Sequence, residues 1–296
     1  MNIVILSRNP ALYSTQTLIV AARRRGHNVR VLDHMQCDIV VQNGKEEIFY
    51  QNERILGINA IIPRIGASAT SYGSAIIRQF EGMGVYTVLS SDSLLKSRDK
   101  LSCLQILAAN DIPIPKSVIS NHPLVIPEMI EQLDQMPIII KLINGTHGLG
   151  VILSENKRNA EAIIEAMFKA RQKLMLQEYI GESKGSDVRV FIVDGEIEGV
   201  MKRQAQEGEF RSNLHRGGTS FVVKLTDEEK RIALKAAKIL NLHVAGVDML
   251  RSNRGPLILE VNASPGLEGI ETTTKKDIAG KIIQCVERNA KASWRK

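Results

Sequence analysis

Short aliphatic runs alternate with amphipathic segments through residues 1–97, and this alternation restricts the possible folds more than any other feature of the sequence. It predicts strands at 3–6, 28–32, 60–62 and 85–89 and helices at 12–25 and 74–82. Strands that alternate with helices form a parallel, doubly wound sheet, whose ligands bind beyond the carboxyl ends of the strands. Arg8 and Arg64 each follow such a strand. Both could therefore face one crevice, although each could equally be a solvated loop arginine.

The remaining sequence divides into two further blocks. Residues 98–180 predict a small antiparallel sheet with helices on one face. Its strands are expected at 117–119, 138–142, 150–153 and 174–177, and its helices at 98–110, 127–135 and 159–173. In the last block, strands are expected at 188–193, 197–202, 221–223, 245–250 and 257–261, and helices at 227–240 and 277–289. The chain is therefore predicted to be α/β and α+β, with three parts at 1–97, 98–180 and 181–296.

The composition of the 296 residues excludes several classes of protein. An apolar fraction of 44% with 24% charged residues is typical of a globular chain and not of a disordered one. The net charge of +7 includes one dense basic run, 23–25, which ends a predicted helix, so we expect no direct nucleic-acid binding. Three scattered cysteines and the lack of a long apolar run indicate a cytoplasmic protein without a membrane span.

A lysine stands on a predicted strand just before a glycine-rich segment. Lys141 is followed by Gly145, Gly148 and Gly150, and another predicted strand comes directly after them. Glycines allow backbone N–H groups to close around phosphate oxygens, and the lysine adds a positive charge. The spacing matches neither a P-loop nor a dinucleotide-binding fingerprint. The segment is therefore either a phosphate-covering hairpin or an ordinary glycine-rich turn.

The strongest local signal is a pair of apolar strands on either side of a turn at 252–256. If the turn centres on Arg254, Asp248 lies opposite Glu260, and Asn262 falls on the same face. Two facing carboxylates repel each other unless a cation separates them, and oxygen ligands of this kind suit Mg²⁺ shared with phosphates. The alternative is two unrelated carboxylates at the edge of a sheet.

Residues 202–218 combine basic and amide side chains with small residues. Such a composition suits a mobile loop that clamps a transferring phosphoryl group, and a solvated surface loop is the alternative. The sequence contains no HExxH or GxSxG motif and no paired Cys and His nucleophile. We therefore expect no covalent enzyme intermediate.

These segments, together with residues 177–180, occur in an order that resembles the ATP-grasp superfamily over nearly the whole chain. The segments 63–66, 210–218 and 262–270 look more closely like the RimK-type ligases, which append glutamate to the C-terminus of ribosomal small-subunit protein six. The resemblance implies an N-terminal parallel-sheet pre-ATP-grasp domain followed by a two-lobed ATP-grasp domain.

The resemblance also implies roles for residues that would contact the nucleotide, the metal and the reaction intermediate. The ATP phosphates would be held by Lys100 and Lys141, the adenine would be read by the hinge at Glu178 and Tyr179, and the ribose would lie near Asp187. The nucleotide-contacting loop would contain Arg211, Ser212 and Asn213. Two Mg²⁺ or Mn²⁺ ions would be held by Asp248, Glu260 and Asn262. Charge on the intermediate would be neutralised by Arg203 and Arg211.

The implied reaction is the ATP-dependent ligation of L-glutamate to the acidic C-terminal tail of ribosomal small-subunit protein six, through an acyl phosphate, with release of ADP and phosphate. Acceptor selectivity is expected from Arg8, Arg64 and Arg216. We expect the enzyme to form a homo-oligomer. Two alternatives remain: an ATP-grasp ligase for another amino acid or small peptide, similar to glutathione synthetase, and a nucleotide-binding regulator without catalysis.

Overall fold

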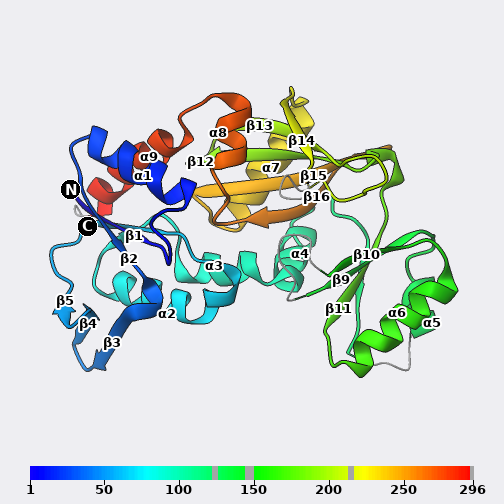
Figure 1. Ribbon diagram of the computed structural model, residues 1–296, viewed down its shortest axis with the longest axis horizontal. Helices are drawn as coiled ribbons and strands as arrows, with labels where there is room; N and C mark the ends of the chain where they lie inside the picture. Colours follow the sequence, from blue (N-terminus) through cyan, green and yellow to red (C-terminus); the bar gives the residue numbers. More distant parts are fainter. Residues whose placement is uncertain (122–125, 144–149, 213–216, 294–296) are drawn as a thin grey trace.

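The computed structural model describes residues 1–121, 126–143, 150–212 and 217–293, with side chains through residue 290. Figure 1 shows an N-terminal α/β domain at one end, a central lobe (green) at the other end, and a C-terminal lobe (yellow to orange) that lies beside both. The predicted combination of one parallel sheet with antiparallel sheets is confirmed. Among the described helices, none is both long enough and apolar enough to cross a bilayer.

A four-stranded parallel sheet forms the centre of the N-terminal domain. Its order is β2 (Asn28–Leu32), β1 (Asn2–Leu6), β6 (Ala60–Pro63) and β7 (Tyr86–Thr87). Side chains alternate along a strand, so Ile3 and Ile5 pack with α1 (Tyr13–Arg24) and α9 (Ile278–Ser293), which lie side by side in Figure 1. On the other face, Val4 and Leu6 pack with α2 (Thr70–Gly82). The C-terminal helix therefore completes the core of the N-terminal domain.

A second, antiparallel sheet in this domain is not among the predicted elements. It consists of β3 (Cys37–Gln42), β4 (Lys45–Tyr50) and β5 (Glu53–Arg54). Gln42 pairs with Lys45, so the turn is Asn43-Gly44. Asn-Gly is the strongest short-range hairpin signal, and it could have revealed the first two strands. Three further short elements described in this domain are also unpredicted: η1 (His34–Gln36), η2 (Ala67–Ala69) and α3 (Ser91–Arg98).

The central lobe contains the predicted antiparallel sheet. Its order is β10 (Val151–Ser154), β9 (Ile138–Leu142), β11 (Leu174–Glu178) and β8 (Ser117–Ile119). Ile138, Ile140 and Leu176 pack with α5 (Ile126–Glu131) and α6 (Lys157–Lys169). The alternating positions, which include Lys141 and Gln177, therefore lie on the face away from these helices. The lobe is preceded by α4 (Lys100–Ala108), whose first N–H groups are capped by Asp99.

The C-terminal lobe is built on a five-stranded antiparallel sheet. Its order is β14 (Thr219–Val222), β13 (Glu196–Gln204), β12 (Ser186–Val193), β15 (Val244–Ser252) and β16 (Gly255–Asn262). One face packs against α7 (Asp227–Ile239), which begins with a capping box between Thr226 and Glu229. The other face is covered at one end by α8 (Glu268–Thr274), where Gly199 leaves room for Ile270. A short helix, η4 (Gly181–Ser183), precedes β12.

Candidate active site

A row of charged side chains crosses one face of the C-terminal sheet. The strand register places Arg203 opposite Asp187, Arg189 opposite Asp248, and Asp248 opposite Glu260. Asn262 lies two residues beyond Glu260, on the same face. Three of the five strands thereby bring acidic side chains into one row with two arginines.

The predicted pairing of Asp248 with Glu260 is confirmed, but the turn is not centred where the sequence pattern suggests. Ser252 pairs with Gly255, so the turn consists of the two residues Asn253 and Arg254. That register alone would bring Leu259 opposite Asp248. A bulge leaves Leu259 as an extra residue and moves Glu260 into the facing position.

Asp248 is held by two arginines from the neighbouring strands. Its carboxylate accepts two hydrogen bonds from Arg189, both at 2.6 Å, and one from Arg203 at 2.8 Å. Arg203 also donates to both oxygens of Asp187, at 2.7 and 2.5 Å. Asp248 is 2% exposed, and although burial alone would raise its pKa, Arg189 and Arg203 hold that pKa at about 2. The carboxylate is therefore ionised and fixed in position.

Glu260 and Asn262 are the more accessible oxygen ligands of the expected metal site. The Glu260 side chain is 52% exposed, and its Oε1 lies 3.9 Å from Arg189 Nη2. Neighbouring protein atoms displace water from the carboxyl group, and this loss of hydration, together with the negative charge of Asp248, raises the pKa of Glu260. The Asn262 side-chain oxygen accepts a hydrogen bond of 2.9 Å from the Ser264 N–H. All three side chains supply oxygen, as a hard divalent cation requires, but Asp248 would have to share its oxygens with Arg189 and Arg203.

Two lysines approach the same carboxylates from the central lobe and from α4. Lys141 Nζ donates to Gln177 Oε1 at 2.6 Å, and Lys100 Nζ donates to the Ile143 carbonyl at 2.9 Å. Burial lowers the pKa of Lys141 to about 8, while the charge of Glu260 raises it and that of Lys100 lowers it further. Burial likewise lowers the pKa of Lys100, with Glu260 again opposing the shift. Both lysines therefore lie close enough to Glu260 to interact with it electrostatically.

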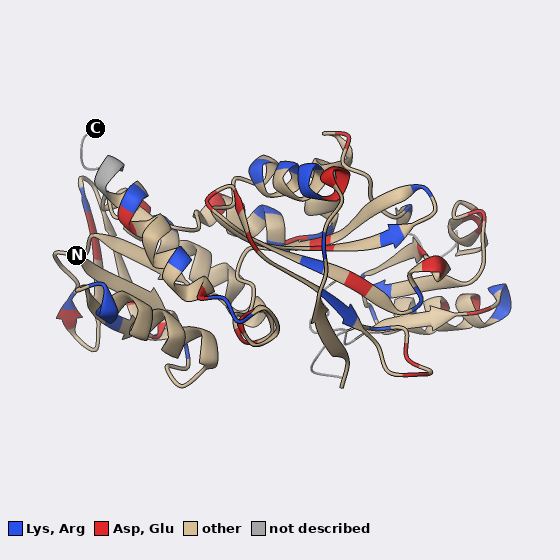
Figure 2. Cartoon of the chain, turned by 90° about the horizontal axis from the view of Figure 1, so that it is seen from above, with Lys and Arg blue, Asp and Glu red and all other residues tan. Residues whose placement is uncertain are grey.

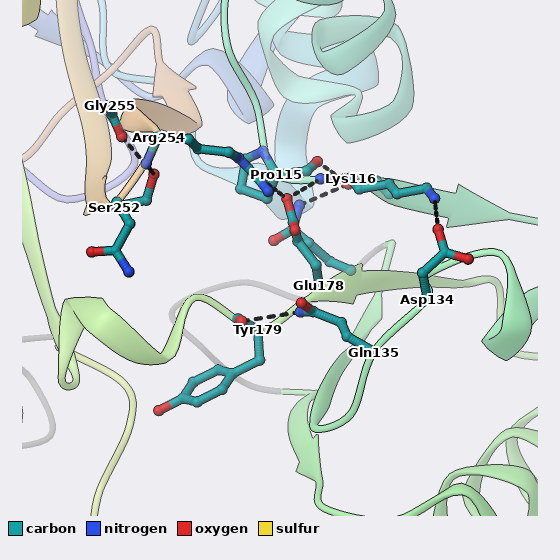
Figure 3. Close-up of polar contacts among 12 residues, drawn as sticks. Pro115, Lys116, Asp134, Gln135, Glu178, Tyr179, Ser252, Arg254 and Gly255 are labelled. Carbon is teal, nitrogen blue, oxygen red and sulfur yellow. Dashed lines mark hydrogen bonds and ion pairs between the residues drawn. The ribbon is translucent and has the colours of Figure 1, made fainter.

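The expected hinge lies where β11 leaves the central lobe. Figure 3 shows the Glu178 carboxylate between Arg254, from the β15–β16 turn, and the main chain of Lys116. Glu178 Oε1 accepts from the Lys116 N–H at 2.6 Å, and the Glu178 N–H donates to the Lys116 carbonyl at 3.0 Å. The Tyr179 carbonyl accepts from Gln135 at 3.1 Å, and the Tyr179 ring points away from Glu178. The segments that enter and leave the central lobe are thus tied to each other and to the C-terminal lobe.

In the segment 202–218, called the basic loop here, Arg211 reaches towards the central lobe. Arg211 is oriented by Glu209, to which it donates at 2.9 and 2.7 Å, and its Nη1 lies 3.5 Å from the Val151 carbonyl on β10. Arg211 lowers the pKa of Glu209 to about 2, against the effect of burial. Ser212, the next residue, is partly exposed, as Arg211 is. Asn213, Arg216 and the glycine-rich residues 144–149 lie outside the described residues.

Three residues of this region are absent from the sequence-based assignment. Arg189 lies two residues after Asp187 on one strand, so the period of two could have placed it in the same row. Gln177 carries the acceptor for Lys141, and it stands within the segment that the sequence had already marked. Arg254 offers no such signal, because its partner Glu178 is 76 residues away.

Comparison with known proteins identifies relatives along the whole chain. The RimK pre-ATP-grasp domain matches residues 1–94, and the RimK-like ATP-grasp domain matches residues 97–286. Probable alpha-L-glutamate ligases from Ectopseudomonas mendocina and Vibrio cholerae are each 50% identical over 290 residues, covering 98% of this chain and 96% of the relative.

Solved structures of low sequence identity share the fold. The ATP-grasp ligase PsnB complexed with a minimal precursor has a TM-score of 0.77 at 22% identity, covering 97% of this chain and 98% of that one. The D-alanine–D-alanine ligase from Bacillus anthracis complexed with ATP has a TM-score of 0.70 at 17% identity, covering 100% and 99%. The likeness extends over the N-terminal domain and both lobes.

Proposed function

This chain belongs to the RimK-like ATP-grasp family of ATP-dependent ligases, and on that premise we propose that it adds L-glutamate to the C-terminal glutamate of ribosomal small-subunit protein six. The relatives that are 50% identical are named as probable alpha-L-glutamate ligases, which supports glutamate as the amine substrate. The observation that carries the proposal is the row of Asp248, Glu260 and Asn262 on one face of the C-terminal sheet, with Lys100 and Lys141 close enough to Glu260 to interact with it electrostatically.

ATP binds between the two lobes in this proposal. Its phosphates lie against Lys100 and Lys141, and its adenine lies at the hinge formed by Glu178 and Tyr179. The Glu178 N–H and the Tyr179 carbonyl already have protein partners, so adenine would use the other main-chain groups of this segment. Arg211 and Ser212, and Asn213 after them, would cover the nucleotide from the basic loop.

Mg²⁺ or Mn²⁺ would be held by Asp248, Glu260 and Asn262, in the proposed form of the enzyme. A bound divalent cation screens the charge between the terminal phosphates and polarises the transferring group. Glu260 is exposed and Asn262 partly exposed, so their oxygens could turn to the ion, whereas Arg189 and Arg203 limit how far Asp248 can turn. Once Asp248 binds the cation, it would neutralise Arg189 less, and the positive charge of Arg189 could then face the transferred phosphoryl group.

The acceptor carboxylate is a poor electrophile, so the proposed first step transfers the γ-phosphoryl group to one of its oxygens. ADP leaves, and the resulting acyl phosphate has a good leaving group. The deprotonated amine of glutamate attacks the acyl carbon, the C–O bond to phosphate breaks, and an amide forms. Carboxylate, ammonium and ATP thus give amide, ADP, phosphate and one proton. Arg203 and Arg211 would stabilise the negative charge of the tetrahedral intermediate.

An oxygen-18 experiment tests this sequence of steps. An acceptor peptide that ends in glutamate and carries oxygen-18 in its terminal carboxylate is incubated with the enzyme, ATP, Mg²⁺ and glutamate. An acyl phosphate transfers one labelled oxygen to the inorganic phosphate for each amide formed. Label in AMP would indicate an acyl adenylate instead. A parallel screen of other amino acids as donors would separate a glutamate ligase from a ligase of the glutathione-synthetase kind.

A further inference from the structure

Three arginines gather at the loop that follows β6, at the carboxyl edge of the N-terminal sheet. Arg64 Nη2 donates to the Pro265 carbonyl at 2.8 Å, and Arg98 Nη2 donates to the Ile65 carbonyl at 2.8 Å. Arg8 Nη2 lies against Gly66, where a β-carbon would be 3.2 Å away from it. Arg8 and Arg98 thus contact the loop at residues 64–66, and Arg64 extends from that loop to Pro265.

Many other arginines in the molecule are paired with a carboxylate. Basic and acidic segments are interspersed over the molecule (Figure 2), and Arg25, Arg54, Arg203 and Arg251 each form an ion pair within 4 Å. Within the part of the chain that the structure describes, Arg8, Arg64 and Arg98 form none at that distance. The hydrogen bonds that the described part of the chain gives to Arg64 and Arg98 go to main-chain carbonyls.

A partly buried cation without a nearby anion is costly, because the loss of water around its charge is not offset. Burial alone lowers the pKa of Arg64 to about 10, with no acidic group opposing the shift. Arginine pairs with carboxylates through two parallel hydrogen bonds, which is why it is common where carboxylates are recognised. The loop therefore has the charge and geometry of a site that an anionic ligand completes.

The loop also lies beside the reaction centre. Ser264, which follows the metal ligand Asn262, places its hydroxyl 3.4 Å from the Pro63 carbonyl. Arg98 is close enough to Glu260 for that carboxylate to raise its pKa against the effect of burial. A ligand held by these arginines would thus present its reacting end to the cleft between the lobes.

We propose that Arg8, Arg64 and Arg98 form a binding site for the carboxylates of a glutamate unit. The inference rests on the proposed function, because it assigns the substrate side of the same cleft. Two sources share this chemistry: free glutamate, which donates the amine, and the terminal glutamate of the acceptor chain. Either would place one or two carboxylates against guanidinium groups that form no ion pair within 4 Å among the described residues.

Steady-state kinetics of Arg8→Ala and Arg64→Ala distinguish the two sources. Loss of one charge-assisted pair raises a Michaelis constant by about tenfold to a hundredfold. A rise in the KM for free glutamate assigns the site to the donor, and a rise in the KM for the acceptor peptide assigns it to the acceptor. The KM for ATP stays unchanged in both cases. The matched control is Arg30→Ala, an exposed arginine of the same domain that pairs with Glu53 at 3.6 Å.

Two further measurements separate recognition from a merely structural effect. In wild-type enzyme, glutamine in place of the affected glutamate unit lacks the side-chain charge and is a poorer substrate; in Arg64→Ala this discrimination shrinks. Gly66→Ala keeps all three charges and shifts the Arg8 guanidinium by a few tenths of an ångström, so it should raise the same Michaelis constant as Arg8→Ala but by less. Wild-type ligation of glutamate with unchanged Michaelis constants in Arg8→Ala and Arg64→Ala overturns the site alone. If the wild type ligates no glutamate at all, the proposed function itself is wrong.

Discussion

The guanidinium of Arg254 contacts the carboxylate of Glu178, and this ion pair joins the hairpin that carries Asp248 and Glu260 to the strand that leaves the central lobe. Glu178 is 6% exposed, and it also caps the N–H of Lys116 where the chain enters that lobe. The Ile258 N–H of the same hairpin donates to the Pro113 carbonyl of the incoming segment at 2.8 Å. The hairpin therefore positions the proposed metal ligands and the proposed nucleotide hinge together.

Arg254→Ala is expected to weaken ATP binding. The substitution leaves the buried Glu178 carboxylate without its cation and loosens the hinge, so we expect the KM for ATP to rise about tenfold. Arg254→Lys keeps the charge, and its KM for ATP is expected to lie between those of the wild type and Arg254→Ala. The control is Arg251→Ala on the same hairpin, because Arg251 pairs with Glu229 of α7 instead. An equal rise in the KM for ATP in the control would show that the hairpin matters only for folding.

Asp248→Asn is expected to reduce both stability and activity. Its carboxylate is the shared partner of Arg189 and Arg203, and removing one member of a buried ionic network costs about 3–5 kcal/mol. Chemical denaturation measures the free energy of unfolding, and phosphate release measures turnover. A variant as stable as wild type would show that the two arginines do not depend on this charge.

Glu260→Gln is expected to separate activity from stability. The Glu260 side chain is half exposed, and repulsion from Asp248 contributes to its raised pKa. Removing its charge should therefore leave the free energy of unfolding unchanged or slightly higher. Turnover should fall by more than about 100-fold, because glutamine lacks the negative charge with which Glu260 would bind the cation at the transferring phosphoryl group. Turnover close to wild type, measured over a range of Mg²⁺ concentrations, excludes Glu260 as a metal ligand.

The pH dependence of ATP use should report on Lys141. Its pKa of about 8 means that the free enzyme loses this charge as the pH rises through that value. We therefore expect kcat/KM for ATP to fall above about pH 8. Lys141→Arg keeps its charge throughout and should remove this fall. Between the folded pKa of about 8 and the ordinary value of 10.5, the unfolded chain holds the extra proton, so this lysine makes the free energy of unfolding increase with pH.

Local patterns predicted the fold where each element signals itself. Hydrophobic periodicity located β2 and β9 at their observed bounds, and the hairpin pattern paired Asp248 with Glu260. That pairing was obtained with a turn centred on Arg254, whereas the structure reaches it through a two-residue turn and the Leu259 bulge. Bulges depend on the packing of the whole sheet, so a single sequence does not reveal them.

Contacts between distant segments lay beyond what the sequence alone can predict. The resemblance placed Asp187 near the ribose, and the structure adds that its carboxylate is 4% exposed and accepts a hydrogen bond from Arg203. Recognising that pairing with Arg203 requires the register between β12 and β13. The partners of Glu178 and Arg64 likewise come from segments that are joined only by the fold. The sequence therefore marked the residue types of the site, whereas the ion pairs that orient them required the structure.

The most direct measurement is intact-mass analysis of an acceptor peptide that ends in glutamate, incubated with the enzyme, ATP, Mg²⁺ and a mixture of the common amino acids. We predict that the peptide gains mass only in whole glutamate residues, with one ADP and one phosphate released for each residue added. Omission of ATP should abolish the gain, and Glu260→Gln should nearly abolish it. A peptide that gains another amino acid, or that stays unchanged while ATP is hydrolysed, would contradict the assignment as a glutamate ligase.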